Sequence, residues 1–138
     1  ECLIFNFNFY QMKTIILLSV TLLMAACGTS SSQERMNVTK FQKEIASHPD
    51  GVVLDVRTPE EVAKGHLKGA VNIDYKSSAF ETSLASLDKS KTYYVYCAAG
   101  VRSDKAAAVM KEKGFKNVYT LEGGIQAWTA AGQEVVKN

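Results

Sequence analysis

One short segment of the chain has the residue types of a reactive-cysteine loop. Cys97 follows the most β-prone run in the sequence, Thr92–Tyr96, and small residues lead from it to Arg102 and Ser103. Small residues let backbone N–H groups turn toward the sulfur, and a helix that begins here would add positive potential. With Arg102, these donors are expected to lower the pKa of the thiol and make it a nucleophile. The whole loop comprises Cys97, Ala98, Ala99, Gly100, Val101, Arg102 and Ser103.

The alternative interpretation of Cys97 is a buried cysteine without a chemical role, which is common for an isolated Cys at a strand end. The glycine and arginine within five residues of it favour the nucleophile. Neither histidine is near the loop in sequence: His66 is expected to bridge backbone groups at a helix end, and His48 to lie on the surface. Activation of the thiol is therefore predicted to be electrostatic, without a general base.

The other two cysteines, Cys2 and Cys27, lie in an N-terminal segment of different composition. Residues 14–26 carry no charge and follow a Met-Lys pair, which is the layout of a secretory signal peptide. The run is shorter than the roughly 20 apolar residues that a bilayer-spanning helix needs. We expect Met12 to be the start, so that residues 12–26 are the signal peptide and residues 1–11 are upstream sequence translated in error.

The end of this run, Leu23–Cys27, resembles a bacterial lipobox, in which small residues precede the cysteine that receives a lipid. The resemblance implies that Cys27 is the lipidated N-terminus of an exported chain. Gly28 after it suggests an outer-membrane anchor that faces the periplasm, and an ordinary signal-peptidase site is the alternative. Residues 27–35 are polar without a hydrophobic period and are interpreted as a flexible tether. The membrane is then expected to be contacted only through the anchor.

The elements that must position the cysteine come from residues 36–138, where apolar runs alternate with amphipathic segments. This pattern predicts an α/β fold with a central, mostly parallel sheet of about five strands and helices on both faces. Ligands of such sheets bind at the carboxyl ends of the strands, which is where Cys97 is expected. The expected strands are 52–54, 70–73, 92–96 and 118–121. Helices are expected to open at Thr39 and at Thr58, where Glu61 would close a capping box, to cover 80–87 and 103–113, and to carry Trp128.

Composition limits the range of functions. The chain has 138 residues, 46% of them hydrophobic and 22% charged, which suits one globular domain. Sixteen Lys and Arg against 14 Asp and Glu give a net charge of +2, spread along the chain, which argues against a nucleic-acid partner. The cysteines form no C-x-x-C and lie far from both histidines in sequence, so neither a metal site nor a disulfide framework is predicted. No cofactor is expected.

Four motifs in order make residues 36–138 resemble the rhodanese-like domain family. They are Leu54–Arg57 followed by Thr58–Glu61, then Gly65–Ile73, then Cys97-x-x-Gly100-x-Arg102-Ser103, and finally Glu122–Trp128. Val62 stands where an aromatic residue is common and Lys68 where proline is common. The resemblance implies a rhodanese-like three-layer fold and a single-domain sulfurtransferase.

The reaction implied by this resemblance is a two-step sulfur transfer. The Cys97 thiolate would attack the sulfane sulfur of thiosulfate or a related donor, sulfite would leave, and a persulfide would remain on Cys97. The amides of residues 98–103 would hold that persulfide until a thiophilic acceptor, cyanide or a thiol, removes the sulfur. Arg102 would bind the anionic donor, and Ser103 would add a hydroxyl donor. The expected partners are thus a small anionic sulfur donor and a thiophilic acceptor, and the chain is expected to be a monomer.

Asp55 and Arg57 match family positions that flank the loop, and two interpretations of them stay open. They are either an electrostatic support of the active site or a structural ion pair at a strand end. Trp128 is interpreted as a core residue.

Two other functions fit the same motifs. One is a non-catalytic sulfur carrier or binding module tethered at the cell envelope. The other is a cysteine phosphatase or arsenate reductase, whose loop has one residue more than the four that Cys97 and Arg102 enclose. The shorter loop makes a smaller cradle, which suits a single sulfur atom better than a tetrahedral oxyanion.

Overall fold

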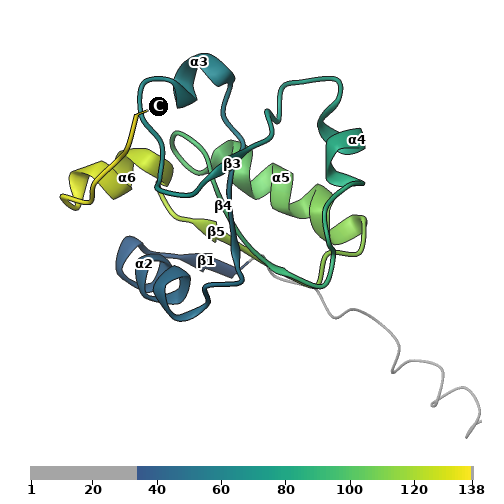
Figure 1. Ribbon diagram of the computed structural model, residues 1–138, viewed down its shortest axis with the longest axis horizontal. Helices are drawn as coiled ribbons and strands as arrows, with labels where there is room; N and C mark the ends of the chain where they lie inside the picture. Colours follow the sequence, from purple (N-terminus) through teal and green to yellow (C-terminus); the bar gives the residue numbers. More distant parts are fainter. Residues whose placement is uncertain (1–33, 138) are drawn as a thin grey trace, which may run out of the picture. The chain divides into compact units, whose positions relative to one another are not determined.

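A five-stranded parallel sheet forms the centre of the computed structural model, which describes residues 34–137 (Figure 1). The strand order is β1-β5-β4-β2-β3, and every neighbouring pair is parallel. The strands are β1 (Glu34–Met36), β2 (Val52–Asp55), β3 (Val71–Asn72), β4 (Thr92–Tyr96) and β5 (Asn117–Leu121). The helices are α2 (Val38–Ser47), α3 (Pro59–Val62), α4 (Phe80–Leu84), α5 (Val101–Glu112) and α6 (Gly124–Ala130). The predicted α/β fold with a parallel sheet is confirmed.

The two faces of the sheet are covered by different helices, as the alternation along β4 requires. Tyr93 and Val95 pack with α4 and α5 on one face, whereas Tyr94 and Tyr96 pack with α2 and α6 on the other (Figure 1). All four side chains are at most 1% exposed, so β4 is buried on both sides. Because Cys97 comes two residues after Val95, its side chain lies on the α5 side, within that core cluster.

The N-caps of two helices, α3 and α2, can be compared with those predicted from the sequence. The predicted capping box of α3 is present: the Thr58 hydroxyl accepts from the Glu61 N–H, and the Glu61 carboxylate accepts from the Thr58 N–H at 3.2 Å. The start of α2 was placed too late, because Asn37 and not Thr39 is its N-cap. The Asn37 side chain accepts from the Lys40 N–H at 2.9 Å. Both residue types are good caps, so the pattern alone could not choose between them.

The sheet begins earlier than the sequence suggested. Glu34 and Arg35, assigned above to the tether, pair with β5 as part of β1. Both side chains are exposed, and only Met36 reaches the core, so this edge strand carries no apolar alternation that could reveal it.

The predicted leader, the tether up to residue 33, and both Cys2 and Cys27 lie outside the described residues. Within residues 34–137, none of the helices has the length and apolar character that crossing a membrane requires.

Candidate active site

Cys97 lies at the carboxyl end of β4, where the chain turns through Ala98, Ala99 and Gly100 into α5. The turn depends on Gly100, whose φ of 100° lies in the left-handed region that favours glycine. The turn brings the Gly100 N–H within 3.1 Å of the Cys97 Sγ, and the Ser103 hydroxyl lies 3.6 Å from the same sulfur. The Cys97 side chain is a free thiol and only 1% exposed. The predicted loop is therefore folded around its sulfur.

Two opposing effects act on the pKa of the Cys97 thiol. Burial is the largest single influence and raises it, because a thiolate loses hydration in the interior. Hydrogen bonds from the Ser103 hydroxyl and from the N–H groups of Ser103, Gly100 and Ala99 stabilise the thiolate. Together they outweigh burial, so the pKa of Cys97 lies below the ordinary value for a cysteine. These donors favour the thiolate, which is the form of a cysteine that can act as a nucleophile.

The first turn of α6 fastens the start of this loop. The N–H groups of Ile125 and Gln126 donate to the carbonyl oxygens of Cys97 and Ala98 at 2.8 and 3.1 Å. Gly124 makes the close approach possible, because a Cβ there would lie only 2.4 Å from the Cys97 carbonyl oxygen and 2.6 Å from that of Ala98. Its φ of +58° also favours glycine. The C-terminal motif thus supports the cysteine loop through backbone contacts.

Arg102, the second residue of α5, is held by a carboxylate. Its Nη1 and Nη2 donate to the two carboxylate oxygens of Glu61 in α3, both at 2.7 Å. This is the bidentate geometry of a strong guanidinium–carboxylate pair. Sequence reasoning assigned Arg102 to an anionic donor and treated Glu61 only as a helix cap. It missed the contact because the two residues are 41 positions apart and neither motif marks the other as a partner.

Asp55 and Arg57 form a second pair of this kind, deep in the structure. Arg57 Nη2 lies 2.6 Å from Asp55 Oδ2, and the two side chains are 6% and 0% exposed. Arg57 also donates to the carbonyl oxygens of Gly65 at 2.8 Å and Glu61 at 3.3 Å, and its guanidinium lies 5.6 Å from the centre of the Tyr96 ring. Of the two interpretations left open above, this geometry is that of a structural ion pair, which fixes the segment that carries α3.

Three further residues named from the sequence have structural contacts. The His66 backbone pairs with Val136 in an isolated bridge, and its imidazole is buried. His48 is exposed at the C-terminal end of α2. Trp128 is 9% exposed, packs edge-to-face against Phe41, and so belongs to the core. None of these contacts involves the Cys97 sulfur.

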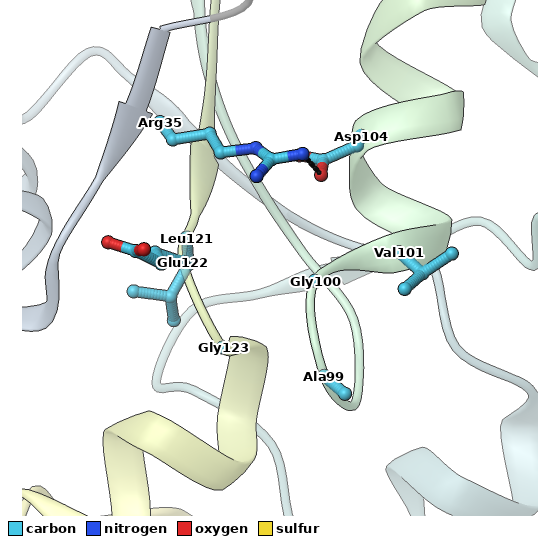
Figure 2. A pocket seen from close by; sticks show the side chains of 8 residues that line it. All are labelled: Arg35, Ala99, Gly100, Val101, Asp104, Leu121, Glu122 and Gly123. Atoms are coloured by element: carbon cyan, nitrogen blue, oxygen red, sulfur yellow. Dashed lines mark ion pairs between the residues drawn. The ribbon is translucent and has the colours of Figure 1, made fainter.

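A cavity of about 200 Å³ borders the loop (Figure 2). Arg35 and Asp104 form an ion pair on one side of it, and Gly100 and Gly123 lie toward the other (Figure 2). Its lining consists of Arg35, Ala99, Gly100, Val101, Asp104, Leu121, Glu122 and Gly123. Because neither Cys97 nor Arg102 belongs to this lining, the cavity adjoins the loop without opening onto the sulfur.

Comparison with known proteins identifies the family. The family model described as a rhodanese-like domain matches residues 37–131. The chain belongs to the rhodanese-like domain family. A crystal structure of a rhodanese-related protein from Thermoplasma volcanium has the same fold, with a TM-score of 0.68 and 32% identity over 76% of this chain and 99% of that one. The predicted rhodanese-like domain is thus confirmed.

Curated relatives of this rhodanese-like domain point to a different reaction from the predicted one. The tRNA uridine(34) hydroxylase of Acaryochloris marina is 36% identical over 89 residues, which are 62% of this chain and 29% of that protein. The enzyme of the same name from Cytophaga hutchinsonii is 41% identical over 86 residues, 60% of this chain and 28% of that protein. The chain therefore spans less than a third of the length of these relatives. The broader prediction, a rhodanese-like enzyme, holds.

Two predictions are overturned by these relatives. Sulfur transfer from thiosulfate through a Cys97 persulfide to cyanide or a thiol is wrong, and so is the exclusion of nucleic acid as a partner. The loop determines how reactive the thiol is, not which substrate it meets, and Arg102 is already paired with Glu61 rather than open to an anionic donor. A net charge of +2 is a sum over the whole chain and does not describe a local surface.

Proposed function

We propose that this rhodanese-like domain takes part in the hydroxylation of uridine 34 in tRNA, with Cys97 as the nucleophile. The observation that carries the proposal is the stabilised thiolate, which lies inside the segment matched by the family model. Relatives named for this reaction share 36% and 41% identity with the chain. Position 34 belongs to the anticodon loop, where a base can leave its stack at low cost and enter a buried site.

The chemistry open to Cys97 follows from the electronic structure of uracil. The thiolate adds to C6, so that an S–C6 bond forms and the electrons of the C5–C6 double bond move onto C5 and O4. C5 then attacks a hydroperoxide: the C5–O bond forms as the O–O bond breaks, and an alkoxide or hydroxide leaves. That leaving group takes the C5 proton, and expulsion of the thiolate restores the double bond. The net change converts a C–H bond and a hydroperoxide into C–OH and an alcohol or water.

The hydrogen-bond donors around the Cys97 sulfur act in both the first and the last step of this reaction. The hydrogen bonds from Ser103, Gly100 and Ala99 stabilise the thiolate before it attacks and again when it leaves C6.

The proposal is tested in a bacterium that lacks its own tRNA uridine(34) hydroxylase. The chain is expressed there, and hydroxyuridine is measured by mass spectrometry in nuclease digests of purified tRNA. We expect hydroxyuridine with the wild-type chain and none with Cys97→Ser, while Cys27→Ser serves as the matched cysteine control and behaves as wild type. Equal hydroxyuridine with Cys97→Ser, or none with the folded wild-type chain, would contradict the proposal.

The covalent step has its own test. An anticodon stem-loop that carries 5-fluorouridine at position 34 cannot lose a C5 proton, so the adduct with the thiolate should persist. We expect a covalent RNA–protein complex whose attachment site maps to Cys97 and which is absent in Cys97→Ser. Hydroxylation in cells without such a complex would keep tRNA as the substrate and reject nucleophilic addition by Cys97.

A second proposal concerns location and rests on residues 12–27 alone. We propose, as the alternative to be tested, that these residues form a lipoprotein signal peptide and that Cys27 is the lipid anchor of an envelope protein. The uncharged run followed by small residues and a cysteine supports it. An exported chain would leave the compartment in which tRNA is modified.

Labelling with a radioactive fatty acid and cell fractionation separate the two proposals. An anchored chain would be labelled, would sediment with membranes, and would lose both properties in Cys27→Ser. A chain that modifies tRNA would be unlabelled and would remain in the cytosol.

A further inference from the structure

Glu61 has contacts that go beyond its role in capping α3. Glu61 closes the capping box with Thr58, and its two carboxylate oxygens also accept the paired hydrogen bonds from Arg102 at 2.7 Å. Arg102 lies five residues after Cys97, and the charge of the thiolate is among the causes that raise the pKa of Arg102, of which the largest is the hydrogen bond that Arg102 donates to Glu61. Arg102 is therefore a cation that interacts with the charge of the thiolate.

The charge on this cation is already balanced. The hydrogen bond from Arg102 is the main cause that lowers the pKa of Glu61 to about 2, so the carboxylate is ionised at neutral pH. The bidentate pair uses one N–H of each terminal nitrogen of Arg102, and it places a full negative charge directly against the guanidinium. The side chains of Arg102 and Glu61 are 18% and 30% exposed, so they lie at the boundary with solvent, where an incoming group can meet them.

We infer that Glu61 is a specificity-determining residue, which neutralises Arg102 and so directs the Cys97 thiolate toward uncharged reactants. A small anion that approaches the thiolate meets an Arg102 whose charge Glu61 already balances, so the guanidinium offers it little net attraction. A neutral reactant, such as a base or an amide, does not depend on that attraction. Because Glu61 acts on the charge of Arg102, this selectivity is expected whichever neutral substrate the chain uses.

A purely structural role for Glu61 can be separated from this one. Glutamine at the third helical position still accepts from the Thr58 N–H and preserves the capping box, so Glu61→Gln removes the charge and keeps the helix start. Glu60 provides a matched control: it is the neighbouring residue of α3, carries the same charge and is exposed, and its hydrogen bonds involve its own backbone N–H and Thr58 rather than Arg102.

The test compares two alkylating reagents of similar size and different charge, iodoacetate and iodoacetamide. Their rates of reaction with Cys97 are measured on the peptide that contains it, so that Cys2 and Cys27 do not contribute. We expect Glu61→Gln to raise the ratio of the iodoacetate rate to the iodoacetamide rate about five- to tenfold, since an unpaired guanidinium near the sulfur attracts the anion. Glu60→Gln should leave the ratio unchanged, and the double variant Glu61→Gln with Arg102→Gln should lose the gain.

Wild-type protein gives a further check that does not depend on the folding of any variant. Its ratio should not exceed that of N-acetylcysteine amide, a neutral free thiol. A larger ratio in the wild type, an unchanged ratio in folded Glu61→Gln, or an equal rise in Glu60→Gln would overturn the inference. So would a Cys97 that reacts with neither reagent, because the thiolate is then closed to neutral molecules as well. None of these outcomes involves tRNA, so they are distinct from a failure of the proposed hydroxylation.

Discussion

Two guanidinium–carboxylate pairs of the same chemistry contact α3, and they differ in how deeply they are buried. In the inner pair, the side chains of Arg57 and Asp55 are 6% and 0% exposed. In the outer pair, those of Arg102 and Glu61 are 18% and 30% exposed. The inner pair cannot open without leaving a charge in the interior, whereas water can replace either partner of the outer pair.

The two pairs also differ in what they hold. Arg57 donates to the carbonyl oxygens of Gly65 and Glu61, so the inner pair fixes the backbone in the second half of α3 and just after it. Glu61 then presents its side chain to Arg102 beside the reactive thiol. We therefore expect the inner pair to contribute mainly to stability and the outer pair mainly to the reactivity of Cys97. The following predictions test this difference.

The largest effect is expected from Asp55→Ala. The substitution leaves the Arg57 guanidinium buried without its carboxylate, which costs about 3–5 kcal/mol of the free energy of unfolding. The measurement is urea unfolding followed by Trp128 fluorescence. Asp50→Ala, an exposed aspartate just before β2, is the control and should leave the free energy nearly unchanged. Similar losses in the two variants would show that the inner pair has no special weight.

Arg57→Lys should have a smaller effect, because the positive charge stays near Asp55. Lysine lacks the planar fork, so the carbonyl oxygens of Gly65 and Glu61 lose their donors, and we expect a loss of about 1–3 kcal/mol. The same unfolding measurement applies. Full stability in Arg57→Lys would mean that only the positive charge matters. The hydrogen bonds from the guanidinium to the Glu61 and Gly65 carbonyl oxygens would then not be needed to fix α3.

Glu61→Gln should reduce stability by about 1 kcal/mol or less at neutral pH, because solvent screens the outer pair. The pKa of Glu61 is lowered from 4.5 to about 2, so its stabilisation is fully present above pH 4.5 and is lost as the pH falls toward about 2. Unfolding of wild type and variant at a series of pH values should show a constant difference above that window and a shrinking one within it. If the difference in the free energy of unfolding grew on acidification, the ionised Glu61 carboxylate would not be the source of the stabilisation.

Ser103→Ala is expected to change reactivity rather than the ion pairs. It removes the hydroxyl that stabilises the Cys97 thiolate, so the pKa of the thiol rises and less thiolate is present at a given pH below it. The iodoacetamide rate at Cys97, measured against pH, should reach its half-maximum at a higher pH than in wild type. Ser86→Ala, at an exposed serine beyond α4, is the control and should leave this pH dependence unchanged. An unchanged pH dependence in Ser103→Ala would show that the hydroxyl does not stabilise the thiolate.

The parts of the fold that sequence predicted are those with strong local signals. The Thr92–Tyr96 run is apolar on both sides because β4 is the buried centre of the sheet, and Thr58 and Glu61 form a complete capping box. β1 was not predicted because two of its three residues are exposed and polar, and it is stabilised mainly by pairing with β5. Local patterns reveal elements that are stabilised locally, and miss those that depend on a distant strand.

The candidate site divides in the same way. The cysteine loop was predictable because its donors lie within six residues of Cys97. The partners of Arg102 and of the Cys97 carbonyl come from α3 and α6, and no spacing rule connects those segments to the loop. The substrate was predicted wrongly because a stabilised thiolate is common to several reactions, and the choice among them rests on groups outside the motif.

The contact between α6 and the loop bears on how this family can be re-engineered. Gly124 lies so close to the carbonyl oxygens of Cys97 and Ala98 that the backbone of α6 and the backbone of the cysteine loop depend on each other for their conformation. A cysteine loop grafted from another member will lose its shape unless residues 123–126 travel with it. In a library of variants, position 124 should accept glycine alone, and natural exchange of loops between members should carry both segments together.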